Sequence, residues 1–189
     1  MSNVRPISET FHMVLNSSKV LSAIEEEAKT TNASKESIKH RAKKILDTMA
    51  GNFHMPLLRL LAWFFRKIYR MMYDNVLLDE RGVSRIKKLL KNIAGKNIAL
   101  MLIPTHRSYL DFLMMSYIMF AYDLPIPHIA AGDDFLNMML VRWIFRHSGA
   151  FFIRRTFKDD KPYKAIFSEY VHRLMADGFP VEFFVEGTR

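Results

Sequence analysis

A histidine followed five residues later by an aspartate can pair a general base with the carboxylate that orients it. The carboxylate fixes one tautomer of the imidazole and stabilises its protonated form. Three such pairs occur in this chain, and they are His106/Asp111, His128/Asp133 and His172/Asp177. We expect at most one of the three to be catalytic. The predicted helices and strands that carry the three pairs therefore decide which pair could be catalytic.

From about residue 96 the chain alternates between apolar runs of strand length and segments of helix length. The runs are 97–103, 126–131, 150–154 and 181–185, and the segments between them are Tyr109–Ala121, Asp134–Arg146 and Tyr163–Ala176. This alternation predicts an α/β fold with a mostly parallel sheet and helices on its faces. Ligands of such sheets bind beyond the carboxyl ends of the strands. The residues that follow each run are therefore the candidates for a site.

This rule favours His106. His172 and Asp177 fall in one predicted helix, where a separation of five residues places them about 140° apart. His128 lies inside a strand run, which indicates a structural histidine. His106 alone follows a strand end, at the turn into a helix.

Two interpretations of the His106 segment stay open. With Ser108 as the helix N-cap, His106 remains on the loop and Asp111 enters in the first turn, so that the two side chains can converge. Alternatively, Ser108 and Asp111 form a capping box, in which the carboxylate binds the N-cap amide and His106 is an ordinary loop residue.

Three of the four strand runs are followed by charged or polar groups. They are His106 and Arg107 after the first run, Arg154 and Arg155 after the third, and Glu186 and Arg189 after the fourth. Arginine suits bidentate binding of phosphate, and Gly187 would allow close approach of the backbone. Their coincidence at one edge of the sheet favours a binding site over a solvated surface.

The composition limits the chemistry and the partners. The chain has no cysteine, which excludes thiol catalysis, zinc–thiolate sites and a disulfide framework. The net charge is +9, and the whole excess lies in residues 1–100. This asymmetry indicates an anionic partner, either nucleic acid or a membrane surface, or else a set of solvated basic helices. The amino terminus shows no pattern of a secretory signal.

The first half is predicted to be helical, with segments near 17–30, 34–50 and 81–92. The segment Met55–Tyr73 stands out, because its arginines fall on one narrow stripe of an otherwise apolar helix. Its four cations argue against a transmembrane helix. An amphipathic helix lying at a membrane interface fits this pattern. The alternative is a helix buried against the following domain, with arginines that snorkel to solvent.

Three segments resemble the motif blocks of the glycerolipid acyltransferase family. THRSYLD, residues 105–111, resembles the first block, H-x-x-x-x-D. GAFFIRR, Gly149–Arg155, resembles the second, and FFVEGTR, Phe183–Arg189, resembles the third. The order and spacing agree with the branch of dihydroxyacetone-phosphate and bacterial-type glycerol-3-phosphate acyltransferases, with more likeness to the former. The fourth block of the family lies downstream of the third, which implies an amino-terminal fragment of a longer protein.

The change of pattern near residue 96 predicts a helical region over 1–95, with the interfacial helix at 55–73, followed by an αβ domain over 96–189. The resemblance implies that this second part is an acyltransferase domain, truncated after the third block. The implied reaction is acyl transfer from acyl-CoA to dihydroxyacetone phosphate, giving 1-acyl-dihydroxyacetone phosphate for ether-lipid and glycerophospholipid synthesis. His106 would be the general base and Asp111 its orienting carboxylate. No covalent intermediate is needed, because a thioester is already activated, and Ser108 is the local nucleophile to test against this direct route.

The resemblance also suggests the substrate-binding residues. Arg155 and Arg189 would bind the acceptor phosphate, Glu186 and Gly187 would shape that pocket, and Arg107 is a further candidate for phosphate or CoA. No metal is expected, and no cofactor beyond acyl-CoA as co-substrate. The expected partners are acyl-CoA, the phosphorylated acceptor and a membrane surface bound peripherally, and no nucleic acid.

The implied location is the peroxisomal membrane. The alternatives are the endoplasmic reticulum, the mitochondrial outer membrane and the bacterial inner membrane. Glycerol 3-phosphate is the alternative acceptor, and a catalytically silent membrane adaptor is the more distant alternative function. A nucleic-acid-binding module would require a recognition motif, and we find none in the sequence.

Overall fold

The computed structural model describes residues 7–93, 95–96, 98–108, 110–157 and 159–185. The helices are α1 (Ile7–Leu15), α2 (Ser18–Thr31), α3 (Lys35–Met49), α4 (Met55–Met72), α5 (Glu80–Ile93), α6 (Leu110–Ala121), α7 (Met139–His147) and α8 (Lys161–Ala176). A 3-10 helix, η1 (Asp133–Asn137), precedes α7. The strands are β1 (Met101–Leu102), β2 (His128–Gly132), β3 (Phe151–Ile153) and β4 (Val181–Glu182).

The strands form one parallel sheet in the order β1-β4-β2-β3. Val181 of β4 pairs with Met101 of β1 on one side and with His128 of β2 on the other. This confirms the predicted α/β fold with a parallel sheet. The expected helix Asp134–Arg146 is divided, because η1 occupies its beginning and α7 starts only at Met139. The division between a helical region and an αβ domain near residue 95 stays a prediction.

Helix starts follow from local capping. Ser17 and Ser34 accept the Val20 and Ser37 N–H groups at 3.3 and 3.2 Å, and so begin α2 and α3. Asp160 accepts the Tyr163 N–H at 3.0 Å and begins α8.

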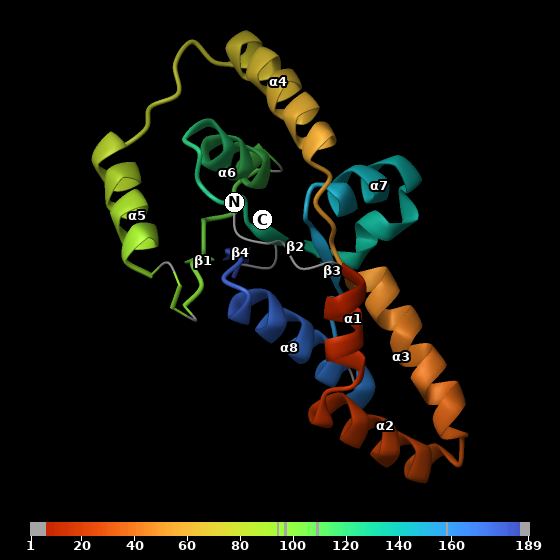
Figure 1. Cartoon of the computed structure of the whole chain (residues 1–189). Helices are drawn as coiled ribbons and strands as arrows, with labels where there is room; N and C mark the ends of the chain where they lie inside the picture. The colour runs from red at the N-terminus through yellow and green to blue at the C-terminus, as the bar shows by residue number, and fades with distance from the viewer. Residues whose placement is uncertain (1–6, 94, 97, 109, 158, 186–189) are drawn as a thin grey trace.

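One face of the sheet is covered by α8, which in turn packs against α1, α2 and α3 (Figure 1). Their shared core includes Leu46, Phe151, Ile166 and Tyr170, all buried. The Tyr170 hydroxyl accepts the Gly51 N–H at 3.1 Å, which ties the end of α3 to α8. The first three helices are therefore part of the core that supports the sheet.

The other face packs against α5 and α6. A second cluster joins Val83 of α5, Met119 of α6 and Leu124, with Leu102 of β1 packed against it. Side chains alternate along a strand, so Glu182, which follows the core residue Val181, points away from α8. Glu182 is fully buried, and among the described residues neither of its carboxylate oxygens has a hydrogen-bond partner. Burial raises the pKa of this carboxyl group to about 8.

The link between α3 and α4 runs beside the end of α7. The Asn52 and His54 N–H groups donate to the carbonyl oxygens of Arg146 and His147 at 2.7 and 2.9 Å, and the Gly149 N–H donates to Asn52 O at 3.0 Å. Gly149 has φ +90°, and a Cβ there would collide with the Phe53 ring. The start of α4 is thus attached by its backbone to the turn between α7 and β3.

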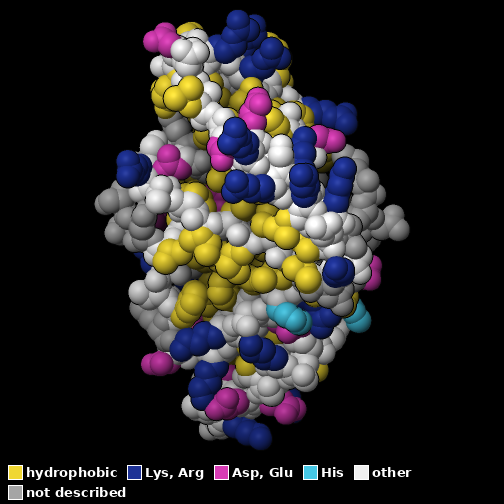
Figure 2. Space-filling view, turned by 90° about the vertical axis from the view of Figure 1, so that its left-hand side faces the viewer, with side chains coloured by type: hydrophobic (Ala, Val, Ile, Leu, Met, Phe, Trp, Pro, Cys, Tyr) yellow, Lys and Arg dark blue, Asp and Glu magenta, His cyan; other side chains and the backbone are white. Residues whose placement is uncertain are grey.

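Large hydrophobic side chains are exposed on several elements. Figure 2 shows the side on which α5 lies, where a band of hydrophobic side chains crosses the surface and lysines and arginines gather above it. β1 is an edge strand on this side, and Met101 in it and Ile103 just after it are exposed. Among the described residues, no helix combines the length and the apolar character needed to cross a bilayer.

Candidate active site

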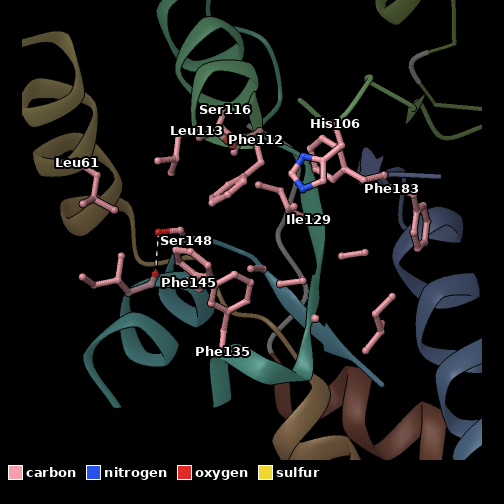
Figure 3. Close-up of a pocket in the computed structure, with 18 of the residues that line it drawn as sticks. Leu61, His106, Phe112, Leu113, Ser116, Ile129, Phe135, Phe145, Ser148 and Phe183 are labelled. Carbon is pink, nitrogen blue, oxygen red and sulfur yellow. Dashed lines mark hydrogen bonds between the residues drawn. The ribbon is translucent and has the colours of Figure 1, made fainter. Parts of the chain in front are cut away.

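A large apolar cavity of about 1090 Å³ lies at the carboxyl ends of the strands. Its walls come from α4, α6, β2 and the η1–α7 segment (Figure 3). His106, Arg154 and Arg155 line it together with Phe183 and Phe184. Of the charged strand ends selected from the sequence, the structure brings His106 of the first run and Arg154 and Arg155 of the third run to one cavity, whereas Arg107 does not line it.

His106 lies on the loop between β1 and α6, and its side chain lines the cavity (Figure 3). The Phe184 ring packs against its imidazole with 4.5 Å between ring centroids. His106 Nδ1 lies 3.6 Å from Asp111 Oδ2, and the two side chains are only 17% and 27% exposed. The distance exceeds that of a hydrogen bond, but such contacts commonly tighten when substrate binds. The arrangement fits an imidazole held by a carboxylate beside an apolar cavity.

Asp111 also caps α6. Its Oδ2 accepts the N–H groups of Arg107 and Ser108, both at 2.6 Å. The capping interpretation of the sequence is thus correct for the carboxylate. It does not compete with the site, because the same oxygen faces His106. Asp111 therefore caps α6 and faces His106 at the same time.

Arg155 is bound by a residue that the sequence reasoning did not select. Its Nε and Nη2 atoms donate to Asp134 Oδ2 at 2.8 and 2.6 Å. Asp134 lies in η1, directly after β2, and it also lines the cavity. The signal that could have found it is its position after the second strand run, where the rule of carboxyl ends applies equally. The candidate site residues predicted from the sequence all follow the other three runs.

The remaining predicted residues differ in their surroundings. Arg154 is turned to Asp160, at 2.8 Å, and its guanidinium lies 4.1 Å from the centre of the Tyr163 ring. Arg107 is exposed, and Ser108 is partly buried beside the start of α6. Glu186, Gly187 and Arg189, which were also predicted from the sequence, lie outside the described residues.

The other two histidine pairs are structural or exposed. His128 is buried in β2, where Nδ1 lies 2.9 Å from Gly149 O, and burial lowers the pKa of its imidazole to about 4. His172 is exposed on α8, and Asp177 caps the end of that helix. The choice of His106 is therefore supported by the position of all three histidines.

Chemically, the site combines a histidine and carboxylate pair, an arginine, and an apolar cavity large enough for a lipid chain. Comparison with known proteins identifies the family. The sequence model of the Acyltransferase family matches residues 86–189. The chain belongs to the acyltransferase family. Within this acyltransferase match lie β1, the cavity loop with His106 and Asp111, and the strand ends with Arg154 and Arg155.

Similar acyltransferases cover nearly the whole chain. The dihydroxyacetone phosphate acyltransferase of Bos taurus is 41% identical over 177 residues, which is 93% of this chain and 25% of that protein. The same enzyme of Homo sapiens is 40% identical over 177 residues, with the same two shares. The glycerol-3-phosphate acyltransferase of Pasteurella multocida (strain Pm70) is 41% identical over 179 residues, 95% of this chain and 21% of that protein. The chain thus spans about a quarter of the length of these acyltransferases.

Proposed function

We propose that the protein transfers an acyl group from acyl-CoA to the hydroxyl of dihydroxyacetone phosphate and so forms 1-acyl-dihydroxyacetone phosphate. The observation that carries this proposal is the His106–Asp111 contact of 3.6 Å at the edge of the apolar cavity. Membership of the acyltransferase family supports the reaction type. The similarity to dihydroxyacetone phosphate acyltransferases supports the acceptor.

In this mechanism Asp111 faces Nδ1 of His106, so the base is the other ring nitrogen, Nε2. It takes the proton of the acceptor hydroxyl as the oxygen attacks the thioester carbonyl carbon. The carbon–sulfur bond then breaks, and the CoA sulfur leaves with the proton returned by the imidazolium. Asp111 stabilises the imidazolium between the two proton transfers. Such general base catalysis contributes typically about 10²–10⁴-fold to a rate.

The cavity would hold the acyl chain. Its lining includes Phe112 and Leu113 of α6, Phe145 of α7 and Leu61 of α4 (Figure 3). These side chains offer no hydrogen bond, so an alkyl chain is the ligand that they favour.

Arg155 would bind the acceptor phosphate, because a guanidinium offers parallel N–H donors to phosphate oxygens. Arg189, with Glu186 and Gly187, is proposed for the same pocket from the resemblance of the third motif. Arg107 and Ser108 directly follow His106 in the sequence, and we propose them as further substrate-binding residues. No metal is required by this route.

The protein would act as a peripheral membrane enzyme through α4. The exposed side of α4 carries Leu60, Trp63 and Phe64 beside Arg59 and Arg66. Aromatic and aliphatic side chains interleaved with cations suit the boundary between headgroups and acyl chains. We propose the peroxisomal membrane as its location, with other intracellular membranes as the alternative.

Glycerol 3-phosphate is the alternative acceptor, and the similarity to the Pasteurella multocida enzyme is the observation that favours it. The test is an assay of the complete natural polypeptide with palmitoyl-CoA and each acceptor in turn. A higher kcat/KM with dihydroxyacetone phosphate is the expected result. Preference for glycerol 3-phosphate would keep the mechanism and change the acceptor. Absence of transfer to both acceptors, with a folded protein, would favour the silent adaptor.

A further inference from the structure

The outer face of α7 is apolar and exposed. Met139, Leu140 and Trp143 are 80%, 70% and 49% exposed, and at 100° per residue they share one side of the helix. Val141 and Phe145 lie on the opposite side, toward the protein interior. A soluble surface helix normally has the reverse pattern, with its apolar side buried. The exposed apolar side of α7 therefore indicates a partner surface.

α7 and α4 are held together at one end. The His54 N–H at the start of α4 donates to His147 O at the end of α7, at 2.9 Å. The rings of His54 and His147 also pack edge to face, with 6.3 Å between centroids. The start of α4 therefore lies beside the end of α7, so a membrane that binds the exposed side of α4 lies close to α7.

Both helices contribute walls of the same cavity. Phe64 of α4 and Met138 at the start of α7 are each about half exposed, and each lines the cavity as well. They therefore lie at its rim. Leu60 and Trp63 continue outward from Phe64, and Met139 and Leu140 continue outward from Met138. The apolar lining of the cavity is continuous with the exposed apolar side chains of both helices.

The charged side chains of the two helical segments are all basic. Arg59, Arg66, Lys67 and Arg70 lie on the exposed side of α4, and Arg142 is exposed on α7. Neither segment 55–73 nor segment 138–143 contains an acidic residue. Lys67 Nζ lies 5.9 Å from the centre of the Trp63 ring, so cation and aromatic ring share one patch. This charge pattern complements anionic headgroups.

We propose that α7 is a second membrane-inserting element, which binds the lipid surface together with α4 so that the cavity opens between them into the acyl-chain layer. This rests on the proposed function for the contact of α4 with membranes. The acyl chain would then enter and the lipid product would leave between Phe64 and Met138, without crossing water. A folded protein partner would bury the same apolar side chains, but the basic residues of both helices and the opening of an apolar cavity favour lipid.

The test uses the fact that the chain has two tryptophans, Trp63 on α4 and Trp143 on α7. Trp63→Phe leaves Trp143 as the reporter of α7, and Trp143→Phe leaves Trp63 as the reporter of α4. Each variant is mixed with phosphatidylcholine vesicles, with and without phosphatidylglycerol. We expect a blue shift of Trp143 emission that is larger with phosphatidylglycerol, and quenching by lipids brominated on their acyl chains.

Three results would overturn the proposal for α7. Trp143 that keeps its aqueous emission while Trp63 shifts would leave α4 as the membrane contact and exclude α7. If neither tryptophan responds, the membrane contact of the proposed function fails as well. A Trp143 spectrum that shifts with protein concentration in the absence of vesicles would instead indicate a second copy of the chain.

A matched pair of substitutions separates lipid from coverage by another part of a longer polypeptide. Leu140→Asp on α7 is compared with Leu21→Asp on α2, because both leucines are exposed. In the complete natural polypeptide we expect Leu140→Asp to weaken flotation with vesicles at least tenfold and to leave Tm unchanged, and Leu21→Asp to change neither. A lowered Tm for Leu140→Asp, with flotation unchanged, would show that protein covers α7 and would overturn the proposal.

Discussion

The Oδ2 atom of Asp111 lies 3.6 Å from His106 Nδ1 and at the same time accepts two backbone N–H groups at the start of α6. One oxygen therefore couples the position of the helix to the orientation of the imidazole. The loop with His106 cannot shift without breaking the cap. The capping bonds thus contribute to the rigidity of the loop that carries His106.

The two roles of Asp111 can be separated by substitution. Asp111→Asn keeps an oxygen that accepts the two N–H groups but removes the negative charge, so we expect stability close to that of the parent and a lower kcat. Asp111→Ala removes the cap as well and should cost about 0.5–2 kcal/mol of stability. Urea unfolding and steady-state kinetics measure the two effects. Equal loss of kcat and full stability in both variants would contradict the shared role.

His106→Ala should lower kcat by about 10²–10⁴-fold, the range of general base catalysis, with little change in KM. The control is His172→Ala, since His172 is exposed on α8 away from the cavity. The double variant His106→Ala/Asp111→Asn should be no slower than His106→Ala, because a carboxylate without its imidazole has nothing to orient. Additive losses would show that Asp111 acts on the reaction independently of His106.

Arg155→Gln should raise KM for the phosphorylated acceptor by about tenfold or more, since a charge-assisted hydrogen bond contributes about 1.5–3 kcal/mol. KM for acyl-CoA should not change. Asp134→Asn should raise KM for the acceptor by a smaller factor, because Asp134 positions the guanidinium, and Asp134→Glu should recover part of the loss. A lower KM in Asp134→Asn would mean that this carboxylate competes with phosphate for Arg155.

Two buried groups predict opposite dependences of stability on pH. Burial raises the pKa of Glu182 from 4.5 to about 8, so the folded state holds a proton that the unfolded chain releases. This contribution to stability is full below pH 4.5 and is lost as the pH rises to about 8. Burial lowers the pKa of His128 from 6.5 to about 4, so its contribution is lost as the pH falls through that interval.

These two dependences offset one another between pH 4.5 and 6.5. Between pH 6.5 and about 8, Glu182 is the one of the two groups whose titration changes the stability. We therefore expect the free energy of unfolding to fall over this upper interval. Glu182→Gln should remove the fall, and Glu36→Gln, on the exposed side of α3, should leave it. Urea unfolding at a series of pH values measures it. An unchanged fall in Glu182→Gln would show that the carboxyl group is ionised in the folded protein.

The sequence was sufficient for the parts of the fold that depend on local pattern. Alternation of apolar runs and helical segments predicted the parallel sheet, and the rule of carboxyl ends selected His106 from three histidines. His128, which is buried and hydrogen-bonded to Gly149 O, and His172, which is exposed, agree with that selection. Position along the chain was enough here because strand ends and helix starts are set by neighbouring residues.

Features that depend on tertiary contact were beyond the sequence. Asp134 and Arg155 are 21 residues apart, and only the pairing of β2 with β3 brings them together. The exposed apolar side of α7 was also missed. Arg142 and Arg146 mark a polar side of α7, but Met139 and Trp143 lie next to them around the helix, so the sequence pattern does not show that these apolar side chains are exposed. The packing of α1–α3 on α8 was likewise invisible, because amphipathic helices do not specify their partner.

Because of that packing, the segment that matches the family model is not a complete folding unit. The family match begins at residue 86, whereas α1, α2 and α3 cover α8. A shortened protein that starts at the match would leave Ile166 and Tyr170 in contact with water. We expect such a fragment to aggregate through these exposed apolar side chains. Expression of the family domain therefore requires the three preceding helices as well.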